Sequence, residues 1–382
     1  MNERLTKVIN SSRWLPAYGW QRLTRRKRRA AGRVHLMIAL ADHFEPSYVP
    51  GAPSGTFAPA DEQRRRLDEW CRVYPKAFDK WRDAEGQPFR HTYFYPAEQY
   101  ERWQLDQLAE HCQDGWGEVE IHLHHGVEAP DTSENTRRML ADFRDTLVSH
   151  GCLSRWDGEG EARYAFVHGN WALANSAGGA CCGVDDEMRI LADTGCYADM
   201  TLPSAPDIAQ VPKINALYEC GRPLEGRAPH RDGRDLRSGV APQVYPLIIG
   251  GPLGLDFGRR VRGVPVPYIE NSILTTRRPA TMERLRHWRE AGITVHGRPD
   301  WLFIKLCCHG MDPRDREAML GELMQKFLAE LTEGASDGGY QVHFVTAREM
   351  VNVILAACDG REGNPGDYRD YRLRLVKPPR AA

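Results

Sequence analysis

Two histidines spaced two residues apart, His122 and His124, are the side chains of this sequence best placed to do chemistry. They lie in the segment Glu-Val-Glu-Ile-His-Leu-His at 118–124, whose apolar and polar residues alternate as in a strand. Side chains two apart on a strand share a face, so we expect Glu120, His122 and His124 to point inward together. Two such imidazoles can bind one divalent cation, and a hydrogen-bonded pair of core histidines is the alternative. His125 has the opposite parity and is expected in a loop, although a strand that ends early would let it join the other two histidines.

An acidic residue stands at the end of the first predicted strand. The apolar run VHLMIALA at 34–41 is followed by Asp42 and His43. In parallel barrels the carboxyl ends of the strands carry the reactive groups. Asp42 would complete a set of two histidines and one carboxylate, with His43 as a further ligand, and such a set suits zinc or another divalent transition ion. Taken alone, Asp42 is equally well explained as a turn residue before Pro46.

Other polar and aromatic residues follow predicted strands at the same end. His309 comes after a strand near residue 306, and Trp171 and Tyr95 offer flat apolar faces on which a sugar ring can stack. Aromatic residues at loop starts are more often packing residues, which is the alternative interpretation. The residues expected to contact a substrate are His168, Asn170, Trp171 and Tyr95.

Strand-like and helix-like segments alternate along most of the chain. Strands are predicted at 34–41, 91–95, 118–124, 164–168, 198–202, 245–249, 301–307 and 341–345. Helices are predicted at 60–83, 97–111, 132–150, 184–194, 281–291, 314–334 and 346–357. The last helix opens with the capping box Thr346-x-x-Glu349, and the helix at 132–150 opens with Asp131-x-x-Glu134.

This alternation predicts an α/β fold, namely a distorted (β/α) barrel of about seven parallel strands. The pattern dissolves into Pro, Gly and Arg at 203–280, which we interpret as a long irregular insertion. The expected organisation is therefore a basic N-terminal arm at 1–32, the barrel at 33–358 and a C-terminal tail at 359–382.

The composition is that of an ordinary globular protein, with 41% hydrophobic and 27% charged residues. No apolar run is long enough for a membrane-spanning helix, and no apolar stretch with a cleavage site follows the basic N-terminus. The ten cysteines include no Cys-x-x-Cys pair, so their spacing predicts neither a disulfide framework nor a thiolate zinc site. We therefore expect reduced thiols and a cytoplasmic protein.

The net charge of −1 conceals a basic arm on an acidic body. Residues 1–41 hold ten Lys or Arg and one acid, a net of +9, and the remainder carries −10. An acidic body argues against a nucleic-acid partner. The arm, which mixes aromatic residues with arginines, is expected either to touch the anionic inner face of a membrane through residues 1–30 or to pack on the body.

The order of these segments resembles the polysaccharide deacetylases, carbohydrate esterase family four, which share a seven-stranded distorted barrel. The matching segments, spread over about 33–357, are Ala41-Asp42-His43-Phe44-Glu45-Pro46, Glu120-Ile121-His122-Leu123-His124, Phe166-Val167-His168-Gly169-Asn170-Trp171 and Lys305-Leu306-Cys307-Cys308-His309-Gly310. This chain has His43 where the family has a second acid, and the arginine of the third motif is missing near Val167. The role of Asp42 therefore stays open between base and metal ligand.

The resemblance implies a metal-dependent hydrolase that removes acetyl from an N-acetylated sugar in a polysaccharide or glycolipid precursor. Asp42 or Glu45 would accept a proton from water, and His309 would protonate the leaving amine. One alternative is a glycosidase on a related barrel that uses Asp42 with Glu120 or Asp199. A second alternative is a catalytically inactive protein that binds carbohydrate or takes part in assembly.

Overall fold

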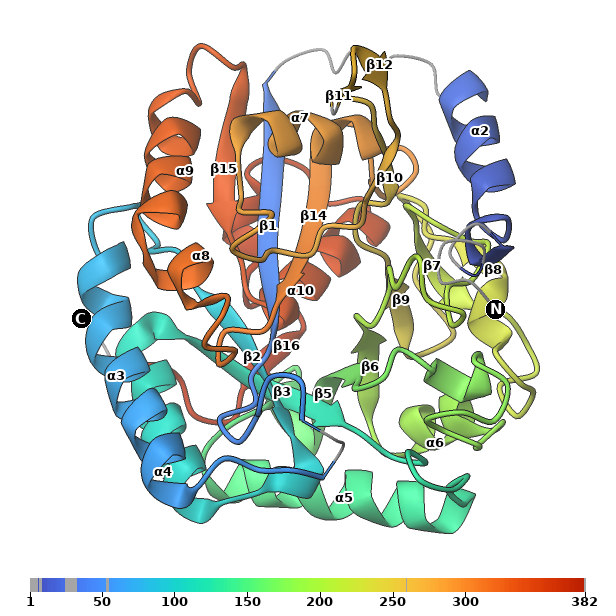
Figure 1. Ribbon diagram of the computed structural model, residues 1–382, viewed down its shortest axis with the longest axis vertical. Coiled ribbons are helices and arrows are strands. Elements are labelled where there is room, and N and C mark those ends of the chain that lie inside the picture. Colours follow the sequence, from blue (N-terminus) through green and yellow to red (C-terminus); the bar gives the residue numbers. More distant parts are fainter. Residues whose placement is uncertain (1–5, 7–8, 25–32, 53–54, 259, 381–382) are drawn as a thin grey trace.

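A run of parallel strands forms the centre of the fold, and helices surround it (Figure 1). In sheet order the run is β14 (Trp301–Cys308), β1 (Val34–His43), β2 (His91–Pro96), β3 (Gly117–Leu123), β5 (Glu159–His168), β6 (Cys196–Asp199) and β9 (Leu247–Ile249). Strand β15 (Tyr340–Phe344) also pairs in parallel with β1. The structure is a computed structural model that describes residues 6, 9–24, 33–52, 55–258 and 260–380.

The connecting helices confirm the predicted alternation. They are α3 (Ala60–Phe78), α4 (Arg102–His111), α5 (Ser133–Ser149), α6 (Glu187–Asp193), α7 (Met282–Ala291), α8 (Arg316–Leu320), α9 (Glu322–Glu333) and α10 (Ala347–Cys358). The capping box of Thr346 and Glu349 begins α10 as predicted, whereas α5 is capped by Thr132. The helix predicted at 314–334 is divided at Gly321, where a side chain would collide with the carboxylate of Glu317.

Alternate residues of the central strands pack on opposite faces of the sheet. Leu40 of β1 and Ile121 of β3 belong to the hydrophobic cluster that includes α3, α4 and α5, and we call this the outer face. Ala41 belongs to a second cluster with α10, on the inner face. Successive side chains of a strand point to opposite faces, and β1 continues to His43. Asp42 therefore lies on the outer face with Leu40, and His43 lies on the inner face with Ala41.

The sheet is largely parallel, but its strand pairings do not close it. Among the described residues no ladder joins β14 to β9. The connections near this position are a hydrogen bond from Nζ of Lys305 to the carbonyl of Met200 (2.7 Å) and an isolated bridge between Ile273 and Cys307. Closure into a barrel therefore stays a prediction.

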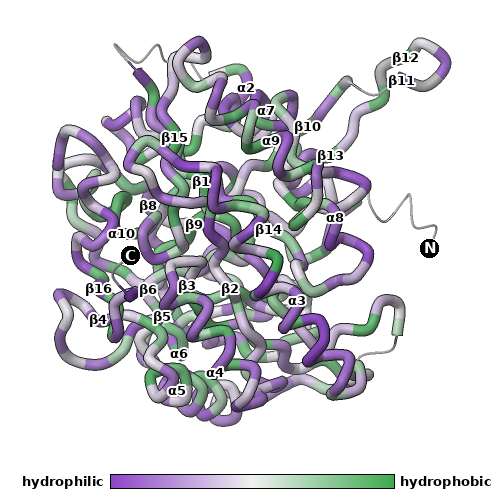
Figure 2. The backbone as a smooth tube through the Cα atoms, turned by 90° about the vertical axis from the view of Figure 1, so that its left-hand side faces the viewer, coloured by the Kyte–Doolittle hydropathy of each residue, from purple (hydrophilic) through white to green (hydrophobic). Residues whose placement is uncertain are grey.

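The segment 203–280 is less irregular than expected. It supplies β9, and β7 (Leu217–Cys220) and β8 (Gly233–Asp235) extend the central sheet in antiparallel fashion beyond it. Two ribbons follow, β10 (Gly254–Asp256) with β13 (Tyr268–Glu270) and β11 (Arg260–Val261) with β12 (Val264–Pro265). The second ribbon projects from the body (Figure 2). Strands of two to four residues between Pro and Gly are too short to give a readable period, which is why only one was predicted.

Both ends of the chain contribute to the fold. Within the predicted tail, β16 (Leu373–Leu375) pairs with β4 (Ser154–Trp156), and Leu373 is fully buried. Near the N-terminus, helix α2 (Leu15–Thr24) follows Trp14, which is buried against Ala205, Ile214 and Leu253. The basic cluster at 25–29, on which the membrane interpretation depended, lies outside the described residues. Among the described helices none is long and apolar enough to cross a membrane.

The packing of Trp14 leads to a prediction about stability. Replacing Trp14 by Ala should lower the free energy of unfolding by about 3–5 kcal/mol, because removal of a fully buried indole leaves a large cavity. Trp20 is 68% exposed on the next turns of the same arm, and Trp20→Ala should change stability by less than about 0.5 kcal/mol. Denaturant unfolding of both variants checks the pair. Equal stability of the two would contradict the packing of the arm on the body.

Candidate metal centre

Two imidazole nitrogens converge on one carboxylate oxygen where β1 and β3 end. Nε2 of His122 lies 3.3 Å from Oε1 of Glu45, and Nε2 of His124 lies 3.1 Å from the same oxygen. His122 ends the inner row of β3, His124 follows the strand, and Glu45 lies in the loop after β1. Ligand atoms around a tetrahedral ion with bonds of about 2.0–2.2 Å lie roughly 3.3–3.6 Å apart. The spacing of these three residues, which we call the His122–His124 centre, fits a divalent ion.

The second ring nitrogen of each histidine is held by an acceptor outside the centre. Nδ1 of His122 donates to the carbonyl of Val167 (2.9 Å), and Nδ1 of His124 donates to Oε1 of Glu98 (2.7 Å). The backbone N–H of His124 donates to the other oxygen of Glu98 (3.2 Å). Metal-binding histidines are oriented in this way, because the outer hydrogen bond fixes the ring and leaves Nε2 for the ion. The outer contacts therefore support the same assignment as the spacing.

The charges at the centre favour an ionised carboxylate. Burial alone would raise the pKa of Glu45, but the hydrogen bond from His122 and the nearby charge of His124 lower it to about 2. Burial likewise opposes the charged form of His124, yet Glu98 and Glu45 hold its pKa above the usual value. A metal ion must displace the proton from His124, so its affinity should fall as the pH is lowered.

Two more imidazoles border the centre. The ring of His43 lies 4.6 Å from that of His122 and 4.7 Å from that of His309, measured between centroids. His43 is buried on the inner row of β1, and His309 is half-buried directly after β14. Burial and the neighbouring histidines lower the pKa of His43 well below its usual value, which keeps the ring neutral. His43 was predicted as a metal ligand, but it is not among the three converging side chains and instead lies beside them. His309, predicted as a proton donor, lies next to His43.

Asp42 does not join His122 and His124, so the predicted ligand set is wrong at this position. Its carboxylate lies on the outer face, where Oδ2 accepts a hydrogen bond from Nδ1 of His91 (2.9 Å) and Oδ1 accepts one from the N–H of Gly310 (2.6 Å). Strand β1 runs two residues beyond the predicted end, and its alternation turns Asp42 away from the inner row. Glu45, predicted as a proton acceptor, occupies the place of the carboxylate ligand. Asp42 instead positions the chain next to His309.

The predicted substrate contacts divide into two pairs. Tyr95 is fully buried and its hydroxyl donates to Oε1 of Gln104 (2.8 Å), so it is a packing residue. His168 is fully buried as well and points toward Glu187.

The other two residues, Asn170 and Trp171, are half-buried in the loop after β5. That loop passes close to His124, because a side chain at the intervening Gly169 would lie 2.3 Å from the imidazole of His124. The start of this loop at Gly169 therefore borders the His122–His124 centre, and Asn170 and Trp171 follow it directly in the chain.

The carboxylates proposed for a glycosidase do not face one cleft. Glu120 is buried on the inner face, where it accepts hydrogen bonds from the hydroxyl of Tyr197 and from the N–H of Ala165 (2.6 Å). Burial raises its pKa well above the usual value. Asp42 lies on the outer face, and Asp199 is buried and accepts a hydrogen bond from Oγ1 of Thr201 (2.7 Å). A pair of carboxylates across a cleft, which glycoside hydrolysis requires, is not formed by these residues.

The outer contact Glu98 and the surroundings of His125 are not indicated by the sequence. Glu98 lies in the short helix η1 (Ala97–Gln99), and no spacing in the sequence links it to His124. His125, expected in a loop away from the site, is buried, and its Nδ1 lies 3.0 Å from Oδ2 of Asp131.

The arrangement supplies three ligand atoms, with two imidazoles beside them. Three protein ligands leave an ion with an open position, as in catalytic rather than structural zinc sites. The centre opens to solvent through His124, whose side chain is 23% exposed, and through half-buried His309. No protein-family model, curated protein or solved structure matches this chain.

Proposed function

We propose that the protein is a metal-dependent hydrolase that acts on a carbohydrate and removes acetyl from an N-acetylated sugar of a polysaccharide or glycolipid precursor. The observation that carries this proposal is the convergence of His122 and His124 on Oε1 of Glu45 at the carboxyl ends of parallel strands. These nitrogen and oxygen donors suit zinc. A bound zinc ion would polarise an acyl carbonyl and lower the pKa of water.

Each of the two bordering imidazoles carries out one proton transfer: His43 accepts a proton and His309 donates one. His43 is neutral and buried, so it keeps a lone pair available at the edge of the centre and serves as the proton acceptor. His309 is half-buried and borders the open side, where a leaving amine departs toward solvent. A proton carried by His309 reaches that amine, and the 4.7 Å between the two rings allows the residues to act on the same reacting group.

Asn170 and Trp171 supply the contacts to the sugar. The side-chain oxygen of Asn170 is buried and has no hydrogen-bond partner among the described residues, so it is available to a hydroxyl or amide of a ligand. Trp171 has a positive φ of 58°, a strained conformation that tertiary packing must hold in place. The half-buried indole of Trp171 can stack on the apolar face of a sugar ring.

The proposal is tested by measuring acetate and free amine released from a panel of N-acetylated oligosaccharides by the full-length protein. We expect acetate and amine in equal amounts, loss of both after treatment with a chelator, and their return when zinc is added. New reducing ends without acetate would indicate a glycosidase. Tight zinc binding with no reaction on any member of the panel would support the alternative of a carbohydrate-binding protein.

A further inference from the structure

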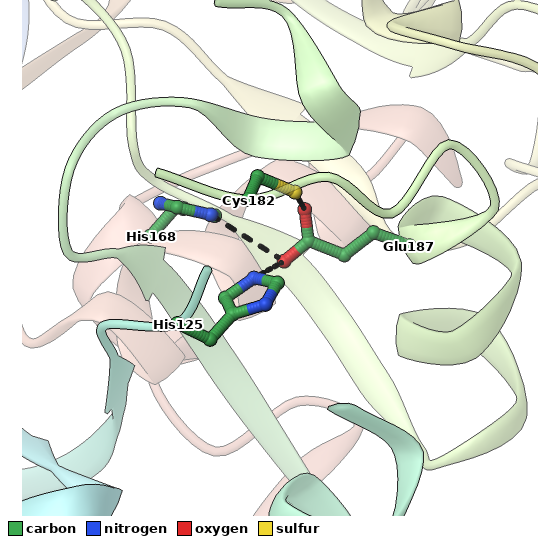
Figure 3. A group of neighbouring side chains, drawn as sticks. All are labelled: His125, His168, Cys182 and Glu187. Atoms are coloured by element: carbon green, nitrogen blue, oxygen red, sulfur yellow. Dashed lines mark hydrogen bonds and ion pairs between the residues drawn. The ribbon is translucent and has the colours of Figure 1, made fainter. Parts of the chain in front are cut away.

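A second group of ligand-type side chains lies next to the first, and all four members are buried. It consists of His125 after β3, His168 at the end of β5, Cys182 in the following loop and Glu187 at the start of α6. The two imidazoles and the thiol surround the carboxylate of Glu187 (Figure 3). We call this group the Cys182 cluster.

The separations between these atoms are those of ligands around an ion. Nε2 of His125 lies 3.1 Å and Nε2 of His168 lies 3.8 Å from Oε1 of Glu187. Sγ of Cys182 lies 3.5 Å from the other carboxylate oxygen. Bonds of about 2.0–2.3 Å to nitrogen, oxygen and sulfur place tetrahedral ligand atoms roughly 3.3–3.6 Å apart, which lies within the observed range.

Hydrogen bonds hold His125, Cys182 and Glu187, but they leave one nitrogen of the cluster without a partner. Nε2 of His168 is buried without a hydrogen-bond partner, because 3.8 Å to Glu187 is too long for one. A buried polar atom without a partner costs about 1–3 kcal/mol. The ring is nevertheless aimed at the carboxylate, together with the ring of His125 (Figure 3). An unpaired nitrogen directed at a carboxylate and a thiol is the arrangement expected of a metal ligand.

The surroundings of the cluster hold its members in position. Nδ1 of His125 lies 3.0 Å from Oδ2 of Asp131, a carboxylate–histidine contact typical of metal sites. The second oxygen of Glu187 accepts a hydrogen bond from the N–H of Ala174 (2.6 Å). Nδ1 of His168 accepts only a long hydrogen bond, 3.3 Å from the N–H of Asn170. Coordination through Nε2 requires the ring proton of His168 to be on Nδ1, which breaks this weak hydrogen bond. Coordination by Cys182 releases the thiol proton to solvent.

We propose that His125, His168, Cys182 and Glu187 form a second zinc site, closed and structural. Four protein ligands fill a tetrahedron and leave no open position for a substrate, in contrast to the His122–His124 centre. A thiolate and a carboxylate balance the two positive charges of zinc, so the buried complex is neutral. The thiolate also selects zinc over the hard cations magnesium and calcium.

The ion would stabilise the loop between β5 and α6, which contains little regular secondary structure. The carbonyl of Cys182 accepts a hydrogen bond from the N–H of Asp131 (2.8 Å), and a side chain at Gly126 would lie 2.0 Å from that carbonyl oxygen. The loop after β5 contains four residues with positive φ that are not glycine, namely Trp171, Ala174, Asn175 and Cys181. A loop with this many strained residues needs contacts from outside to hold it. Three of the four proposed ligands supply them, with His168 and Glu187 at its two ends and Cys182 within it. The same loop forms the wall beside His124.

Metal analysis of the full-length protein tests the proposal independently of any activity. We expect two zinc ions per chain, one in the Cys182→Ser variant, and two in the matched control Cys181→Ser, whose sulfur is outside the cluster. X-ray absorption of zinc should show one sulfur neighbour at about 2.3 Å that Cys182→Ser removes. Unchanged zinc content in Cys182→Ser, or a zinc spectrum without sulfur, would overturn the proposal.

Two further measurements separate this site from the first. A variant with both His122 and His124 replaced by Ala should retain one zinc ion with a sulfur neighbour, even if the proposed hydrolase activity is never found. Should Cys182→Ser fail to fold, wild-type protein loaded with cobalt still decides the matter, because a thiolate ligand produces a sulfur-to-cobalt charge-transfer band. Absence of that band in fully loaded wild-type protein excludes Cys182 as a ligand.

Discussion

His122→Ala protein should contain one zinc ion fewer per chain than the wild type and should release no measurable acetate. The substitution removes one of three ligands, so the loss of affinity should exceed the roughly 10–100-fold expected for loss of an outer contact. Glu98→Gln removes such an outer charge from His124 and should weaken zinc binding within that smaller range. Zinc content and zinc titration of the purified proteins measure both effects.

Asp42→Asn is the informative control for this prediction. The carboxylate of Asp42 in the wild type lies on the outer face and accepts hydrogen bonds from His91 and Gly310. The variant should therefore keep its zinc at the His122–His124 centre. The set predicted from the sequence, with Asp42 as the third ligand, requires the opposite result. Loss of zinc from Asp42→Asn together with full zinc in Glu45→Gln would show that the assignment from the structure is mistaken.

His309→Ala should lower the turnover of an N-acetylated sugar by roughly 10²–10⁴ while both zinc ions stay bound. The imidazole borders the centre without belonging to its ligand set, so its removal leaves the ion in place. An aryl acetate distinguishes the role of the residue, because its leaving group departs without being protonated. We expect His309→Ala to hydrolyse that ester at nearly the rate of the wild type.

Other outcomes assign His309 differently. Loss of zinc along with activity would make it a ligand, and an equal loss on amide and ester would make it a positioning residue. Unchanged turnover on the sugar would remove it from the mechanism.

The sequence predicted the order of the elements and the inner histidines because both depend on local periodicity. The parity of β3 correctly placed His122 opposite Ile121, and the alternation of strands and helices gave the α/β class. The error at Asp42 arose from a strand end that was placed two residues too early, so that the alternation of β1 was not applied to this residue. A shift in a strand end does not change the fold class, but it decides which face a side chain occupies.

The Cys182 cluster could not be predicted, because its residues are brought together by the path of a loop. His125 follows the end of β3 at Leu123, and beyond a strand end parity no longer says where a side chain points. Cys182 has no second cysteine at the spacing of a zinc motif, so the sequence offered no signal for a thiolate ligand. The chain turns back at Gly126, whose φ of 62° favours glycine, and this turn directs His125 to a partner 62 residues away.

His124 and His125 are adjacent in the chain, yet they face two different clusters. One peptide unit would therefore serve two ions, and ordering the backbone for one of them prepares it for the other. Any change that one ion makes in the affinity for the other is reciprocal, so it has the same factor in both directions. If both proposed sites bind zinc, this dipeptide joins them through a single peptide unit, and a zinc titration of the wild type shows whether the two sites fill independently.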